Sequence, residues 1–125
     1  MASVPSVDQY ERAFRSFRIA DALPETHRKL LQLHYCSAGR TATATELAAG
    51  MKFKDYSAVN LHYGTFGANL AARLKWHVPE GEPAASSFAT FEGGPADDPH
   101  TKWIMRPEVA QVIEKLRIVR PCPEV

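Results

Sequence analysis

Five histidines and two cysteines give this 125-residue sequence the side chains that most often hold transition metals. His34 and Cys36 lie two positions apart in an expected helix, and this spacing points them to different faces. His62, His77 and His100 fit no spacing typical of a zinc site. We therefore expect no metal site and no cofactor.

The residue types of hydrolytic catalysis are present, but without a catalytic arrangement. No serine lies in a Gly-x-Ser-x-Gly context, and Gly93–Gly94 lacks the Lys-Ser/Thr that completes a phosphate-binding loop. Asp97, Asp98 and His100 resemble parts of a nuclease cluster. Prolines on both sides of the two aspartates favour a solvated turn instead. The sequence predicts no catalytic residues and a chain that is not an enzyme.

The clearest structural pattern is a pair of helices between residues 43 and 74. Thr43 and Glu46 have the spacing of a capping box, which opens a helix that ends at about Met51. A turn follows, and then a longer helix from about residue 56 to residue 74. These elements predict a helix-turn-helix, a unit whose second helix fits the major groove of a duplex. Such turns often carry glycine where this chain has Lys52.

The second helix has two apolar sides, so its orientation stays open at this point. In one orientation Ala58 and Leu61 are the buried anchors. In the other, an apolar stripe at helical spacing is buried, which suits a helix central to the core or one that covers a partner. The first orientation turns outward Lys54, Tyr56, Asn60 and Tyr63. The second buries Val59, Tyr63, Phe66 and Leu70.

The remaining segments supply two more helices before this unit and a hairpin after it. A capping box at Ser6 opens a helix over about residues 7–20, and Pro24 begins one that reaches about Cys36. Residues 87–91 and 102–105 read as strands, and Pro107 begins a last helix. We expect one domain over residues 1–125, mainly α with a small antiparallel β-hairpin and winged-helix-like. Its helix-turn-helix spans about 43–74, its hairpin wing about 86–106 and its C-terminal helix about 107–117.

The charge is nearly balanced overall but unevenly distributed. The net charge is +1, with ten Lys/Arg and six Asp/Glu in residues 1–77 and five acidic residues but no Lys/Arg in residues 78–100. The mildly basic remainder is compatible with a surface that faces phosphates. The sequence shows neither a signal peptide nor a membrane span, which predicts a cytoplasmic protein without a membrane partner. In that compartment Cys36 and Cys122 are expected to be reduced.

Several strings resemble a small bacterial module that recurs beside HNH-type nuclease domains in putative restriction endonucleases. They are Leu33–Tyr35, Arg40–Ala44, Leu47–Ala48, Tyr56–Gly64, Gly67 and Trp103–Glu108. The resemblance spans about residues 24–118. No His-Asn-His metal centre can be assembled from this sequence, so the resemblance implies recognition of DNA or an accessory role rather than cleavage.

Two functions follow as expectations. The first is a non-catalytic module, associated with restriction or defence, that binds double-stranded DNA. Its expected contact residues are Arg40, Thr43, Lys52, Lys54, Tyr56, Ser57, Asn60, Tyr63, Lys102 and Arg106. Arginine and lysine would hold phosphates, and Tyr56, Ser57 and Asn60 would face bases. The alternative is a protein-interaction module that binds a nuclease partner, or a second copy of itself through the helix at 56–74.

Overall fold

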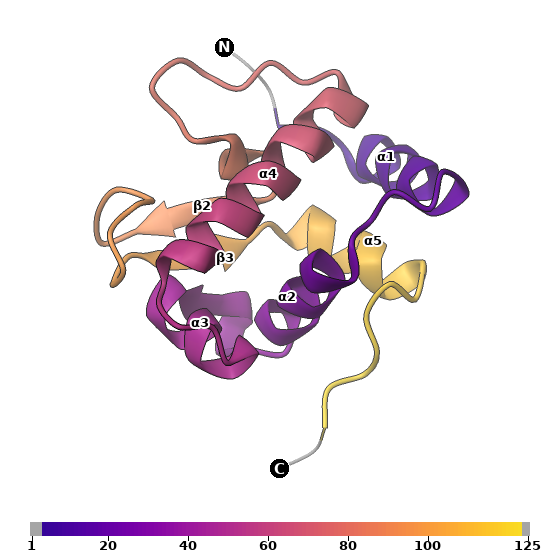
Figure 1. Ribbon diagram of the computed structural model, residues 1–125. Coiled ribbons are helices and arrows are strands. Elements are labelled where there is room, and N and C mark those ends of the chain that lie inside the picture. Colours follow the sequence, from indigo (N-terminus) through magenta and orange to yellow (C-terminus); the bar gives the residue numbers. More distant parts are fainter. Residues whose placement is uncertain (1–3, 124–125) are drawn as a thin grey trace.

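The computed structural model describes residues 4–123, and they form a mainly helical fold with one small sheet (Figure 1). The elements run in the order α1 (Val7–Ile19), α2 (Glu25–Tyr35), η1 (Ala38–Arg40), β1 (Thr41–Thr43), α3 (Ala44–Met51), α4 (Ser57–Leu74), η2 (Ala84–Ser87), β2 (Ala89–Glu92), β3 (Lys102–Met105) and α5 (Pro107–Lys115), where η marks a short 3-10 helix.

The helix starts follow the capping signals in the sequence. The Ser6 hydroxyl accepts from the N–H of Gln9, and the Gln9 side chain accepts from the N–H of Ser6, so the predicted capping box of α1 is confirmed. Thr43 and Glu46 make the same reciprocal pair at the start of α3. Pro107 occupies the first turn of α5, where its missing N–H costs no hydrogen bond.

The sheet has three antiparallel strands in the order β1-β3-β2. The predicted hairpin is confirmed as β2 and β3, but it begins at Ala89, because residues 84–87 form the 3-10 helix η2 rather than strand. The third strand, β1, was not predicted. It pairs Thr41 with Ile104 and Thr43 with Lys102, and its three residues run directly into the cap of α3.

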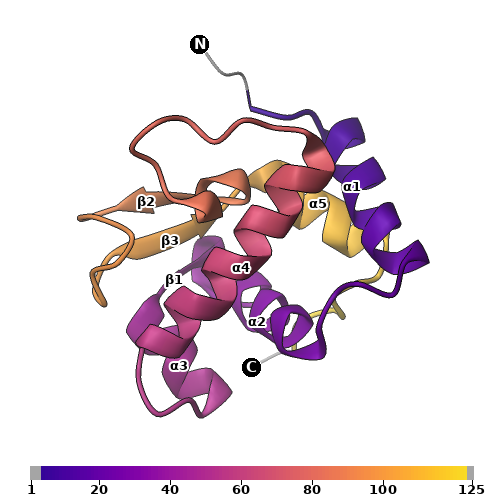
Figure 2. The ribbon, with the colours of Figure 1, turned by 45° about the horizontal axis from the view of Figure 1, so that its top comes forward.

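Helix α4 is the central element of the fold, between the sheet on one side and α1 and α5 on the other (Figure 2). Its buried side contributes Tyr63 and Phe66, which contact Phe88, while Phe66 also meets Phe14 of α1. Gly67 lets η2 cross closely, since a Cβ there would lie 2.6 Å from the carbonyl oxygen of Ala84. The core is therefore an aromatic cluster built around one helix.

A buried histidine ties this core together. His34 of α2 is fully buried; its Nδ1 lies 3.0 Å from the Tyr63 hydroxyl and its Nε2 lies 2.9 Å from the carbonyl oxygen of Trp103. Burial lowers the pKa of His34 to about 4, so the ring is neutral near pH 7. In the neutral ring Nε2–H donates to the Trp103 carbonyl, and the acceptor Nδ1 shares the single Tyr63 hydroxyl proton with the Leu30 carbonyl. His34 thus joins α2, α4 and β3.

Candidate nucleic-acid interface

The turn between α3 and α4 is the best-formed part of the candidate interface. Lys52 ends α3 in the left-handed conformation, with φ of 60°, at the position where such turns often carry glycine. The N–H of Phe53 donates to the carbonyl of Ala48 at 2.9 Å and closes the turn. The backbone at Lys52 thus has the shape expected for glycine, while the side chain adds an exposed cation.

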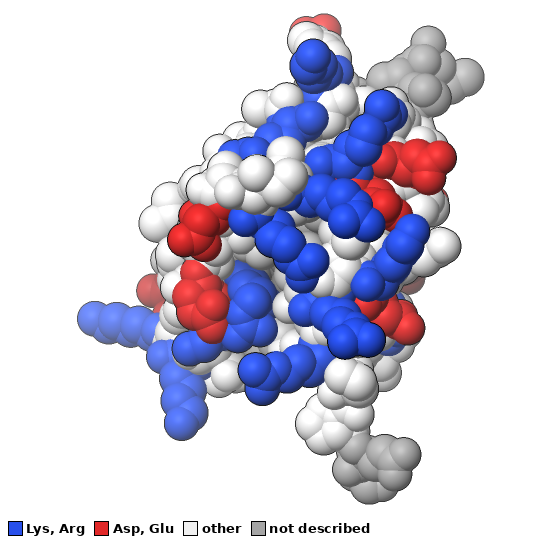
Figure 3. Space-filling view, turned by 90° about the vertical axis from the view of Figure 1, so that its right-hand side faces the viewer, with Lys and Arg blue, Asp and Glu red and all other residues white. Residues whose placement is uncertain are grey.

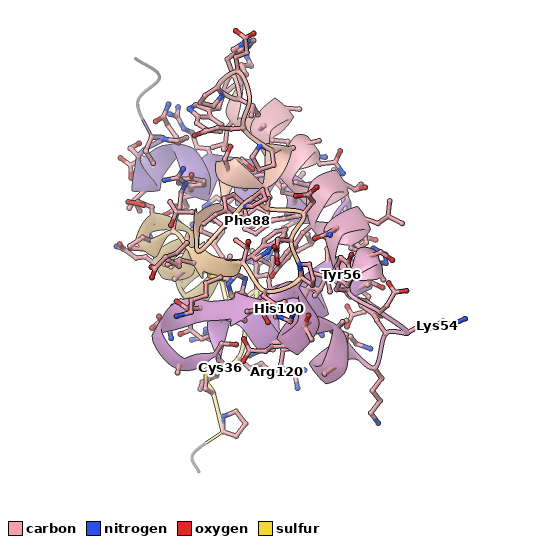
Figure 4. The ribbon with its side chains drawn as sticks, turned by 90° about the vertical axis from the view of Figure 1, so that its left-hand side faces the viewer. Cys36, Lys54, Tyr56, Phe88, His100 and Arg120 are labelled. Atoms are coloured by element: carbon pink, nitrogen blue, oxygen red, sulfur yellow. A yellow bond between two sulfur atoms is a disulfide. The ribbon has the colours of Figure 1, made fainter. Side chains whose placement is uncertain are left out.

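Residues 54–57, which lead from the turn after α3 into α4, are exposed. Lys54 extends away from the body of the protein, and Tyr56 lies between it and His100 in the view of Figure 4. Asp55 accepts hydrogen bonds from the Ser57 N–H, at 2.8 Å, and from the Ser57 hydroxyl. These hydrogen bonds lower the pKa of the Asp55 carboxyl. The Ser57 hydroxyl is therefore bonded to Asp55, and a base would have to compete for it.

The orientation of α4 overturns part of the expected site. Tyr63 is fully buried, whereas Leu61 is 69% exposed, so the helix buries the stripe from Val59 to Leu70 and turns its supposed anchor outward. The expectation that Tyr63 points outward to DNA is wrong. Its hydroxyl proton is shared between the Leu30 carbonyl and His34, and its ring packs on Phe88.

Asn60 lies at the border between the exposed and buried sides of α4. It is half-buried, and its Oδ1 is enclosed without a hydrogen-bond partner among the described residues. It lines a small cavity of about 140 Å³ that Asp97 of the hairpin loop and Trp103 also line. Its amide is thus less open to a duplex than the sequence suggests, and a carboxylate lies on the same cavity.

Two further expected residues lie at β1: Arg40 directly precedes the strand and Thr43 is its last residue. The Arg40 guanidinium stacks over the Tyr35 ring at 4.1 Å from its centroid. The Thr43 hydroxyl accepts from the N–H of Glu46 at 3.1 Å, as the cap of α3. Both side chains therefore have intramolecular contacts, and neither is presented as freely as the lysines of the turn.

The two hairpin cations lie at opposite ends of β3. Lys102 is exposed and pairs in the sheet with Thr43 on one side and Glu92 on the other. Arg106 is half-buried, and its Nε donates to the Ser86 carbonyl at 3.0 Å. Only Lys102 lies on the stretch of sheet that leads to the hairpin loop, whereas Arg106, expected as a phosphate contact, bonds to the backbone of η2.

The hairpin loop is docked on the helices rather than projecting from them. The N–H and the hydroxyl of Thr45 both donate to the Pro99 carbonyl, at 3.3 and 3.0 Å, which fixes the loop to the start of α3. The same loop carries Asp97 and Asp98.

Residues 38–72 and 76–106, which we call the turn-and-hairpin side, contain five Lys/Arg and seven Asp/Glu. This side therefore has a net negative charge.

A second surface carries most of the positive charge. Residues 4–37, 73–75 and 107–123, which we call the basic side, contain ten Lys/Arg and six Asp/Glu. Figure 3 shows these cations gathered over α1 and α5. Some of these cations are neutralised by ion pairs, since Arg15 and Lys115 both pair with Glu11. The spacing of arginines in α1 suggested only a solvated face, and sequence alone could not show that α5 and the chain after it would enlarge it.

The cysteines depart from the expectation of reduced thiols. Cys36, which follows α2, forms a disulfide with Cys122 across 86 residues of sequence, with a Cα–Cα distance of 5.4 Å. Two cysteines so far apart have no recognisable spacing, and only the packing of the C-terminal segment on α2 brings them together. The expectation that they are reduced is therefore wrong.

Neither a metal centre nor a membrane span is found in the part of the chain that the structure describes. Within residues 4–123 no three His, Cys, Asp or Glu side chains gather as metal ligands would. None of the helices in that range has both the length and the apolar content needed to cross a bilayer.

No family model, curated protein or solved structure matches the chain.

Proposed function

We propose that the chain is a non-catalytic DNA-binding module of the winged-helix type that places the start of α4 against a duplex. The order α2-β1-α3-α4-β2-β3, with β3 in the middle of the sheet, is the arrangement expected of a helix-turn-helix backed by a hairpin. The resemblance to modules beside HNH-type nucleases supports an association with restriction or defence. The observation that carries the proposal is the exposed pair Lys52 and Lys54 on the turn that leads into α4.

The composition of α4 defines how such a module would read DNA. Between Ser57 and Ala72 the helix contains no charged residue. Leu61 on the helix and Tyr56 directly before it are exposed large apolar side chains, and Leu61 suits apolar contact with a thymine methyl group. Phosphate contacts then fall to the flanking lysines, including Lys102. Few phosphate contacts imply weak binding with a shallow salt dependence.

The test is a duplex-binding titration across a salt series with two matched double variants. Lys52→Ala with Lys54→Ala removes the turn cations, and Arg12→Ala with Arg15→Ala removes the same charge from α1. If each lysine neutralises one phosphate, the turn variant should lower the slope of log K against log salt by about 2. The α1 variant should leave that slope unchanged. If the α1 variant lowers the slope and the turn variant does not, the DNA binds the basic side and the proposal is overturned.

A second candidate function rests on the outer face of α4. Leu61 is 69% exposed there, beside uncharged residues such as Thr65 and Ala68. A second copy of the chain could bury this face, in agreement with the alternative of self-association. Sedimentation equilibrium of the wild type and of Leu61→Glu distinguishes the two functions. A dimer that the substitution dissociates favours self-association, and a monomer at all concentrations excludes it.

A further inference from the structure

A groove where the basic side meets the end of α3 has features of a peptide-binding site. It lies between α2, the end of α3 and the segment 120–123, with a volume of about 490 Å³. Leu33 and Met51 supply its apolar lining. The helices approach closely there, since a Cβ on Gly50 would lie 2.4 Å from a methyl carbon of Leu33. The floor is therefore a tight contact between two helices.

The wall opposite α2 is fixed in two ways. The Gln32 amide donates to the Arg120 carbonyl at 3.0 Å and accepts from the Arg120 N–H at 2.7 Å, so one side chain holds both backbone groups. The disulfide between Cys36 and Cys122 ties the same segment to the end of α2. Figure 4 shows Cys36 and Arg120 together at one end of the molecule. The groove is thus a constructed feature rather than a gap beside a loose tail.

The rim of the groove carries three cations against one nearby carboxylate, Glu25, whose charge interacts with all three. Arg28 is paired with Glu25 at 2.6 Å. Lys29 and Arg120 are exposed and make no ion pair among the described residues. Gln32 bonds only to the backbone of Arg120, so the Arg120 guanidinium is available to a ligand.

We propose that this groove binds an acidic peptide segment that inserts one apolar side chain between α2 and the segment 120–123. The cations of the rim would face carboxylates on either side of that residue, and Leu33 with Met51 would bury it. A nucleic-acid backbone would use the cations but leave the apolar lining unfilled, which is why the lining favours a peptide. This site borders the turn proposed to bind DNA, since Met51 directly precedes Lys52, but its cations, Lys29 and Arg120, are not those of the turn.

Fluorescence anisotropy with a labelled short peptide, one leucine flanked by glutamates, tests the proposal on the oxidised protein. Lys29→Ala with Arg120→Ala should weaken binding roughly three- to tenfold, as expected for the loss of two exposed ion pairs. The matched control Arg12→Ala with Lys75→Ala should bind as the wild type does. Replacing the leucine by glycine, or the glutamates by glutamines, should each weaken binding.

Reduction of the disulfide provides an independent test of the proposal. Reduction frees the segment 120–123 from α2, so peptide affinity should fall in the reduced protein, while the variant Met51→Glu should bind poorly in either state. Binding that is indifferent to the leucine, to the rim cations or to reduction would overturn the proposal. Displacement of the peptide by a short duplex in wild type would assign the groove to nucleic acid, and peptide-free self-association through it would assign it to a second copy. Either outcome would also overturn it.

Discussion

The turn-and-hairpin side and the basic side divide between them what a DNA-binding surface normally combines. The first has the helix-turn-helix, with exposed lysines at Lys52 and Lys54, but a net negative charge. The second has an excess of four positive charges but presents the sides of α1 and α5 rather than an element that enters a groove. Shape and charge are thus separated, and each side suits a different kind of partner.

The separation matters because electrostatic attraction is short-ranged in physiological salt. The screening length there is about 8 Å, so the exposed cations of α1 add little to a duplex held at the turn. Conversely, the acidic hairpin loop lies close to α4, since Asp97 and Asn60 line one cavity. A duplex on the turn would meet this loop, whereas an acidic peptide on the basic side would avoid it.

The largest expected effect comes from the stripe of α4 that supports the turn. Replacing Tyr63 with Ala removes a fully buried ring and should lower the free energy of unfolding by about 3–5 kcal/mol. Replacing Leu61 with Ala should change it by less than about 0.5 kcal/mol, because the side chain is largely exposed. Urea denaturation of both variants measures this. Similar losses in the two would show that α4 is turned differently.

The next effect concerns the basic side, where the disulfide holds the C-terminal segment. Closing a loop of this length restricts the unfolded chain, so Cys36→Ser with Cys122→Ser should lower the free energy of unfolding by about 2–4 kcal/mol. DNA binding at low temperature, where the variant is still folded, should be unchanged. Loss of DNA binding in the folded variant would show that the two sides are not independent.

Acid should weaken the connection between the sides at His34. Its pKa is about 4 in the folded protein and about 6.5 when exposed, so the unfolded chain binds more protons between these values. The stabilisation is therefore full above the higher pKa and is lost as the pH falls toward the lower. Between about pH 7.5 and pH 5 the free energy of unfolding should fall by about 2 kcal/mol.

Denaturation at both pH values measures this loss, and substitution separates its sources. His34→Gln should remove most of the pH dependence, whatever it does to the stability itself. The control is His27→Gln, because burial, together with nearby His62, also lowers the pKa of His27. If the pH dependence survives in the His34 variant and disappears in the His27 variant, the acid sensitivity belongs to His27.

Local signals in the sequence predicted the elements well and their orientation poorly. The capping boxes at Ser6 and Thr43 involve residues three apart, and both form as predicted. Strand β1 depends on pairing with β3, about 60 residues later, and no local pattern predicts a strand of three residues. The disulfide depends on an equally distant contact. Features made by residues near in sequence were predictable, and those made by tertiary packing were not.

The site shows the same limit within one helix. With apolar residues on two sides of α4, periodicity could not decide whether Leu61 or Tyr63 faces the core. The answer came from partners that the sequence does not place: the Leu30 carbonyl and His34 satisfy the Tyr63 hydroxyl. The basic side was missed for a related reason, because its cations come from three separated segments.

The smallest expected change in stability is at Asn60, which stands between the two interpretations of α4. Its Oδ1 is enclosed without a partner among the described residues, so Asn60→Ala removes no hydrogen bond made by that atom. The free energy of unfolding should change by less than about 0.5 kcal/mol. If the amide turns outward to read a base, the same change should cost about 1–3 kcal/mol of discrimination at one base position. Asn69→Ala, exposed on the same helix, is the matched control and should alter neither quantity. An Asn60 variant that melts much earlier while its preferred duplex is unchanged would make Asn60 a brace for the hairpin loop, and base recognition would then rest on Tyr56 and Leu61 alone.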